Sequence, residues 1–224
     1  MDGVSDQMKW IRTGKQRTAI VNVLRKPATQ LELLRLAQKQ APNLQLGDVW
    51  GIFQEGIERG VFECLNPGEP TGKVFFYTDA GRQAVADAFG VHLDVPPAID
   101  WHCYGRVIRA KVRRLVLLQV AHNGPGAVER NTATFIRQQL SQPHKLAINT
   151  VIRALHQLVH EGLLFARISK EGRRVFMLSE KGRQIAEQID RPILIVEERH
   201  RLEAAIPNDL PETVIKEDYS VEAW

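Results

Sequence analysis

Polar and basic side chains recur at helical spacing between residues 146 and 161, in a pattern that could contact the bases of a nucleic acid. Asn149, Arg153 and His156 stand three or four residues apart, which places them on one face of a helix. The whole expected face consists of Asn149, Thr150, Arg153, His156, Gln157 and His160. Arginine can pair with the O6 and N7 atoms of guanine, so Arg153 is the first candidate for base recognition. The alternative for the whole set is an ordinary solvated helix face.

Four cations lie around a predicted turn that follows this helix. Apolar runs at Leu163–Ser169 and Arg174–Ser179 flank the sequence Lys-Glu-Gly-Arg at 170–173, which predicts a β-hairpin with a basic tip. The cations are Arg167, Lys170, Arg173 and Arg174. Four positive charges on one hairpin favour contact with DNA phosphates or with a minor groove over a role in solubility alone.

Further cations precede these elements. Arg106, Arg109 and Arg113 recur at three- and four-residue steps, so we expect them to share one face of a helix. That face could hold phosphates or only be solvated, and the sequence favours neither role. Lys145 stands just before the polar helix and completes the candidate DNA-binding set.

An apolar stripe on the same helix predicts which side packs against the core. On the helix Leu146–Glu161 this buried stripe is expected to be Ile148, Val151, Ile152, Leu155, Leu158 and Val159. Gly162 then ends the helix, because glycine readily takes a positive φ. The polar face is therefore expected to point away from the core, beside the basic hairpin.

The same pattern occurs earlier in the chain. Val74–Gln83 matches Val175–Gln184 in residue type at a constant offset of 101. Lys15–Leu24 matches Lys111–Val120 in apolar pattern. The stripe of the later helix and its terminal glycine are matched, at an offset of 102, by Leu46, Val49, Trp50, Phe53, Ile57 and Gly60. Three matching segments in the same order predict two copies of one domain.

The expected fold is mainly α with small β-hairpins, an α+β arrangement, in two tandem domains. In domain 1, residues 1–90, the pattern predicts a polar lead, Met1–Thr13, followed by three helices, Lys15–Lys26, Thr29–Gln40 and Leu46–Arg59. A hairpin of Val61–Leu65 and Lys73–Thr78 comes next, and a last helix runs from Thr78 to Gly90. In domain 2, residues 101–190, it predicts helices Arg106–Ala121, Asn131–Ser141, Leu146–Glu161 and Ser179–Ile189. Pro96 and Pro97 lie in a semi-rigid linker at residues 91–100. Residues 191–224 form a C-terminal extension with an acidic tail.

Charge is distributed unevenly between the two copies. The chain of 224 residues has a net charge of +4. Residues 101–190 contain 15 Lys and Arg against 6 Asp and Glu, a net +9, whereas residues 1–100 are net −1 and residues 191–224 net −4. Only the second copy carries the excess of cations expected of a nucleic-acid-binding domain.

The third helix of the first copy is acidic where the second copy is polar and basic. Its expected solvent face consists of Gly47, Asp48, Gly51, Gln54, Glu55 and Glu58, while Trp50, Phe53, Phe75 and Phe76 are expected in the core. Carboxylates on such a face oppose approach to a polyanion. We therefore expect domain 1 to contact a protein partner, a second copy of the chain, or the DNA backbone weakly. Residues 191–224 are a further candidate for dimerisation, or for competition with DNA.

Two short stretches carry a resemblance to known proteins. Tyr77–Arg82 and Leu178–Arg183 resemble the strand-to-helix junction of MarR- and PadR-like regulators, and the order of helices and hairpin resembles the winged helix-turn-helix domain. The resemblance implies a sequence-specific double-stranded DNA-binding protein, a transcriptional regulator. Winged helices also serve as protein-interaction modules, as in ScpB and ESCRT-II subunits, and tandem pairs are similar to plasmid or mobile-element replication initiators. These remain the alternatives.

Other classes of function find little support in the sequence. The chain has no Gly-rich phosphate loop, paired carboxylates or nucleophile elbow, so no enzyme activity is expected. His156 and His160 have a spacing that could hold a metal, but no third ligand is near in sequence, so no metal or cofactor is expected. Cys64 and Cys103 lack paired spacing and suit a reducing cytoplasm. With no apolar run of ~18 residues and no signal-peptide core, a cytoplasmic, nucleoid-associated location is expected.

Overall fold

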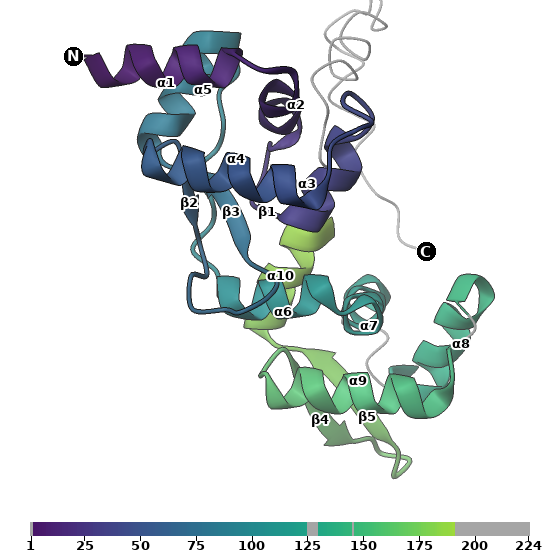
Figure 1. The fold of residues 1–224 in the computed structure, drawn as a ribbon. Helices are drawn as coiled ribbons and strands as arrows, with labels where there is room; N and C mark the ends of the chain where they lie inside the picture. The colour runs from purple at the N-terminus through teal and green to yellow at the C-terminus, as the bar shows by residue number, and fades with distance from the viewer. Residues whose placement is uncertain (1, 125–129, 145, 191–224) are drawn as a thin grey trace, which may run out of the picture. The chain divides into compact units, whose positions relative to one another are not determined.

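The structure, a computed structural model, describes residues 2–124, 130–144 and 146–190 (Figure 1). This part of the chain is mainly helical and contains two small antiparallel sheets. Among the described helices, none combines the length and the apolar character needed to cross a membrane. The expectations for Lys145 and for the extension at 191–224 fall outside the described residues.

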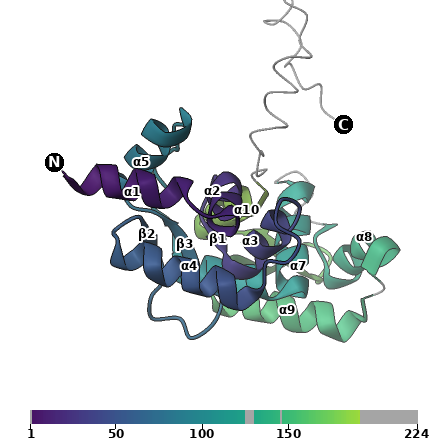
Figure 2. The same cartoon turned by 45° about the horizontal axis from the view of Figure 1, so that its top comes forward.

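The first repeat forms the elements that its sequence pattern predicts, with two additions, the helix α1 and the strand β1. Its elements are α1 (Asp2–Arg12), α2 (Lys15–Val23), β1 (Ala28–Thr29), α3 (Gln30–Ala37), α4 (Leu46–Glu58), β2 (Phe62–Cys64), β3 (Val74–Tyr77) and α5 (Asp79–Phe89). The polar lead, for which the sequence analysis predicted no helix, contains α1. This helix packs alongside α5, as both views show (Figures 1 and 2), and it buries Trp10 and Ile11. Burial of these two side chains explains why a polar segment folds.

Side-chain caps fix the helix starts, as the sequence predicts. Thr29 accepts a hydrogen bond from the backbone N–H of Glu32, whose carboxylate accepts one from the backbone N–H of Thr29. Thr78 accepts from the N–H of Gly81 at the start of α5. Each bond satisfies a helix-terminal donor that would otherwise have no partner in the helix.

The second repeat differs from its prediction at its first helix. Its elements are α6 (Trp101–Arg109), α7 (Lys111–Asn123), α8 (Ala133–His144), α9 (Ile148–His160), β4 (Leu164–Ile168), β5 (Arg174–Leu178) and α10 (Glu180–Asp190). The single helix Arg106–Ala121 is wrong, because the chain is extended at Ala110, with φ −97° and ψ 93°. Asp100 caps the earlier helix by accepting from the N–H of Cys103 at 2.9 Å. The chain therefore turns between two separate helices.

The two hairpins have the predicted strands but different surroundings. In the first repeat β3 lies between β1 and β2, with Ala28 opposite Phe75 and Phe62 opposite Tyr77. In the second repeat β4 pairs with β5 alone. The N–H of Phe176 donates to the carbonyl of Asn131 at 3.1 Å, so this segment takes the place of a third strand.

Each repeat has its own apolar core, but three residues of the predicted stripe of α4 lie outside it. Phe53 and Phe75 stack in the first core with ring centroids 4.4 Å apart. Trp50 was expected in that core, but 41% of its surface is exposed and only its edge contacts Phe75. Leu46 and Ile57, from the same predicted stripe, are also exposed. The apolar stripe of α4 is thus wider than the core that it covers.

The repeats contact each other through the loop of the first hairpin, residues 65–73. Val74, which follows this loop, packs into the second core rather than the first. The side-chain amide of Asn66 is fully buried and donates to the carbonyls of Gly72 and Trp101. Across a second contact, Lys26 donates to the carbonyl of Gln188 at the end of α10. A cation at this position satisfies a carbonyl that lacks a helical partner.

Candidate nucleic-acid interface

Helix α9 has one buried face and one exposed polar face, as its spacing predicts. Val151, Leu155 and Leu158 are completely buried in the second core. The six residues expected on the other face are all exposed, namely Asn149, Thr150, Arg153, His156, Gln157 and His160. A helix held rigidly by one face can present the other to a ligand without reorganisation.

The exposed face of α9 is slightly hollowed. Its shallow depression is lined by Asn149, Ile152, Arg153, His156, Gln157 and His160. These side chains supply amide, imidazole and guanidinium groups, which can donate to or accept from base edges. Such chemistry suits the floor of a major groove better than an apolar ligand.

The second hairpin contacts this face through the first residue of its second strand, β5. Arg174 begins β5, and its Nη1 lies 3.3 Å from Nε2 of His156. A guanidinium can only donate, so this contact is a hydrogen bond when Nε2 of His156 acts as the acceptor. This contact connects the helix face to the hairpin, so that bases and adjacent phosphates could be contacted together.

The tip of the hairpin carries exposed cations on an ordered turn. The N–H of Ser169 donates to the carbonyl of Arg173 at 2.7 Å, and the N–H of Arg173 donates to the hydroxyl of Ser169. Gly172 has φ 75°, which glycine adopts without strain. Lys170 and Arg173 are exposed, and the ion pair of Arg173 with Glu171 is 3.4 Å long and solvated. Such a pair is weak enough to yield to a phosphate.

One cation that the sequence analysis missed belongs to the same surface. Arg130 lines a depression with Thr132 and Thr134 of the α8 start and with Arg173 and Arg174 of the hairpin. Thr132 caps this helix by accepting from the N–H of Phe135. A helix N-terminus with adjacent cations favours anions. In the sequence, a basic residue two positions before a capping threonine could have indicated that Arg130 lies at this helix start.

The predicted face of Arg106, Arg109 and Arg113 does not form. Because the chain turns at Ala110, the first two lie on α6 and the third on α7. Arg106 donates to Glu69 at 2.7 Å, and Arg109 donates to the hydroxyl of Thr71, both in the loop of the first hairpin. The hydrogen bonds from Arg106, which are the largest influence, hold the pKa of Glu69 below its ordinary value. These two arginines join the repeats.

Arg113 also has a partner within the second repeat. Its Nη1 donates to Oε1 of Glu161 at 2.7 Å, and both side chains are largely buried. Separating such a pair would leave a carboxylate with poor solvation. We therefore remove the three arginines from the phosphate-binding set that the sequence predicts.

The equivalent face of α4 lacks side chains at two of the positions that α9 offers to a base. Gly47 and Gly51 stand where α9 has Asn149 and Arg153. The acidic character expected there is partly neutralised, because Glu55 accepts from Trp10, Arg17 and Arg59. Desolvation raises the pKa of Glu55, but these partners outweigh it and the pKa lies below its ordinary value.

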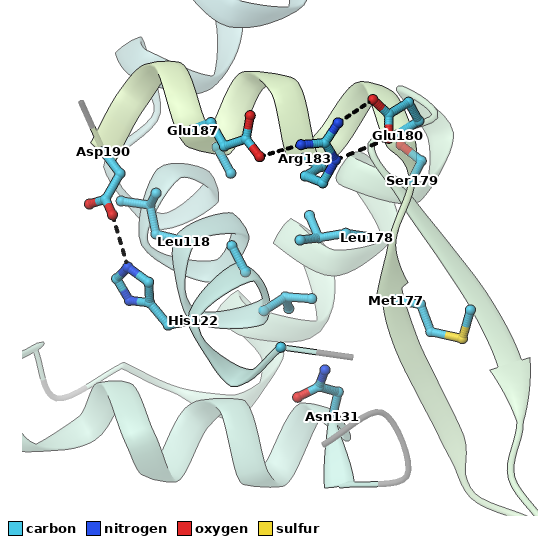
Figure 3. Close-up of a pocket in the computed structure, with 14 residues that line it drawn as sticks. Leu118, His122, Asn131, Met177, Leu178, Ser179, Glu180, Arg183, Glu187 and Asp190 are labelled. Carbon is cyan, nitrogen blue, oxygen red and sulfur yellow. Dashed lines mark hydrogen bonds and ion pairs between the residues drawn. The ribbon is translucent and has the colours of Figure 1, made fainter. Parts of the chain in front are cut away.

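A separate pocket of about 450 Å³ lies between α7, β5 and α10 (Figure 3). Leu118, Met177 and Leu178 contribute apolar surface to it. Its charged rim is internally paired, since Arg183 bonds to Glu180 and Glu187, and His122 contacts Asp190 at 3.3 Å. No residue of the predicted DNA-binding set lines this pocket.

Within residues 2–124, 130–144 and 146–190, no three His, Cys, Asp or Glu side chains are grouped so that they could hold a metal ion. Neither protein-family models, nor curated proteins, nor solved structures provide a match to the chain.

Proposed function

We propose that this chain is a sequence-specific double-stranded DNA-binding protein, acting as a transcriptional regulator and built of two tandem winged-helix domains. In this proposal α9 enters the major groove and the hairpin β4–β5 is the wing that follows the adjacent backbone. Arg153 is assigned to a base edge, while Lys170, Arg173, Arg174 and Arg130 are assigned to phosphates.

The observation that carries the proposal is the continuous surface formed by α9 and the second hairpin. Six polar side chains of one helix face are exposed, and Arg174 connects that face to a tip with exposed Lys170 and Arg173. Residues 101–190 also hold the net charge of +9. Cations beside a polar, exposed helix match the two kinds of contact that specific DNA binding needs.

The first repeat supports the same proposal by contrast. The loop of its hairpin contacts α6, because Glu69 of the loop accepts a hydrogen bond from Arg106 of the helix. This hairpin therefore has a structural role. Its third helix has Gly47 and Gly51 at the reading positions. In the proposed division of labour, the second domain therefore reads DNA and the first does not.

Selection of binding sites from a pool of random duplexes by the full chain tests the proposal. We expect enrichment of one sequence motif, and tighter binding of that motif than of a scrambled duplex at two salt concentrations. Binding that depends on salt but shows equal affinity for both duplexes would contradict sequence-specific recognition. Absence of binding at low salt would contradict DNA binding itself.

A further inference from the structure

Part of the apolar stripe of α4, which corresponds to the apolar stripe of α9, is exposed. Leu46, Trp50 and Ile57 lie along it with exposed fractions of 47%, 41% and 36%. Leu31 of α3 is 49% exposed and lines the same groove as Leu46. Scattered apolar side chains are normal on a protein surface, but a contiguous group marks an interaction site.

Two glycines flatten the adjacent solvent face of this helix. Gly47 and Gly51 stand one turn apart, and a Cβ at either position would meet nothing within 4 Å. The packing of this chain therefore does not require glycine there, although glycine inside a helix costs about 1 kcal/mol relative to alanine. The missing side chains would let the backbone of another helix approach closely.

A cationic groove lies beside the start of α4, where the helix itself carries Asp48, and an exposed carboxylate lies at its end. At its start, the groove that Leu46 lines is also lined by Arg35, Lys73, Lys111 and Arg114. Lys73 belongs to the helix face as well, because its Nζ lies 5.5 Å from the ring centroid of Trp50. At its end, Glu58 is exposed. An antiparallel copy of the same helix would bring each exposed carboxylate to a cationic groove, which selects a second copy of this chain as the partner.

We propose that α4 is the interface of a symmetric dimer, in which the α4 helices of two copies pack antiparallel. With the two-fold axis crossing the exposed side of α4 midway between Leu46 and Glu58, Glu58 of each copy faces the cationic groove of the other. Gly47 then lies opposite Ile57 of the second copy, and the small residue makes room for the large one. This proposal goes beyond DNA binding and does not depend on it.

The size of α4 sets the expected strength of the dimer. Its 13 residues span about 20 Å, so a single helix pair with its flanking groove is a small interface. We therefore expect reversible association that dissociates on dilution. Sedimentation equilibrium of the full chain should show a mass that rises with concentration from the monomer value of 25.4 kDa toward twice that value.

Gly51→Arg is the decisive variant for this interface. Arginine is a better helix former than glycine and has open space at this position, so the fold is retained. In the dimer the two added cations would lie close together, and we expect the dissociation constant to rise about tenfold or more. Gln83→Arg, on the exposed side of α5, adds the same side chain elsewhere and should leave association unchanged. A chain that is monomeric at all concentrations, or a dimer insensitive to Gly51→Arg, would overturn the proposal.

A charge exchange tests the antiparallel arrangement. Glu58→Lys and Lys73→Glu should each weaken association, whereas the double variant restores opposite charges across the two-fold axis and should recover part of it. If the double variant loses as much association free energy as the two single variants lose together, the antiparallel pairing is contradicted. Circular dichroism and thermal unfolding of each variant confirm that the monomer remains folded.

Discussion

Gly72 and Gly105 meet backbone to backbone where the loop of the first hairpin crosses α6. A Cβ at Gly72 would lie 2.8 Å from the carbonyl oxygen of Gly105, and a Cβ at Gly105 would be closer still to the carbonyl oxygen of Gly72. Real Cβ atoms do not tolerate such distances. The two glycines therefore permit the contact through which Arg106 and Asn66 join the repeats.

Gly105→Ala should destabilise the protein by about 1–3 kcal/mol, because the added methyl group forces the loop and helix apart. Urea unfolding followed by circular dichroism measures the change. Gly51→Ala is the matched control, since its Cβ meets nothing within 4 Å and should stabilise α4 by about 1 kcal/mol. Equal effects of both substitutions would mean that the close approach at Gly105 does not constrain the fold.

Arg153→Ala should cost about 1–3 kcal/mol of binding free energy on the selected DNA site, because a bidentate contact to a base is lost. Preference at one base position should relax, which a set of single-base variants of the site would show by fluorescence anisotropy. Arg12→Ala removes an exposed arginine of the first repeat and should have no such effect. An unchanged ratio of specific to scrambled affinity in Arg153→Ala would reduce this residue to a phosphate contact.

Replacement of Lys170, Arg173 and Arg174 by alanine should weaken binding to every DNA sequence. Each lost phosphate contact should flatten the slope of log K against log salt by up to about 0.9. The control removes the same charge from exposed cations of the first repeat, Lys9, Arg12 and Lys39. If only the control alters the slope, the hairpin does not face DNA.

Asp100 should make stability depend on pH in the acid range. Partial burial raises the pKa of Asp100, but hydrogen bonds from Lys181 and from the N–H of Cys103 outweigh it and lower the pKa from 3.8 to about 2. A lowered pKa in the folded state stabilises the protein above the unfolded value, so this contribution is present above about pH 4 and is lost as the pH falls through 2.

The comparison variant for this carboxylate is Asp100→Asn, whose amide oxygen can still cap α6. The stability difference between the native chain and Asp100→Asn, measured by urea unfolding, should shrink as the pH falls from 5 to 2. Lys181→Met removes the partner cation, which donates to Asp100 at 2.8 Å, and should reduce the same pH dependence. A difference that is constant over this pH range would show that Asp100 does not titrate with a lowered pKa.

The sequence alone was sufficient for the elements whose pattern is local. The stripe containing Val151 and Leu155 predicts α9 because burial repeats every 3.6 residues, and Thr29 and Thr78 predict helix starts because a cap needs only the next turn of the chain. The exposed polar face of α9 follows from the same periodicity, and the basic hairpin follows from two short runs around a turn that contains glycine. Within the described residues, these predictions agree with the structure to within a few positions.

Only the tertiary structure decided which of the predicted DNA-binding side chains are already bonded to other parts of the protein. Arg106 and Arg113 share a spacing in the sequence, but their partners Glu69 and Glu161 come from distant segments, so periodicity could not identify them. The break at Ala110 has the same origin, since α6 is held by the loop of the first hairpin. Trp50 illustrates the limit of the apolar pattern. The pattern indicates which residues can be buried, but the area of the core that faces them decides which residues are buried.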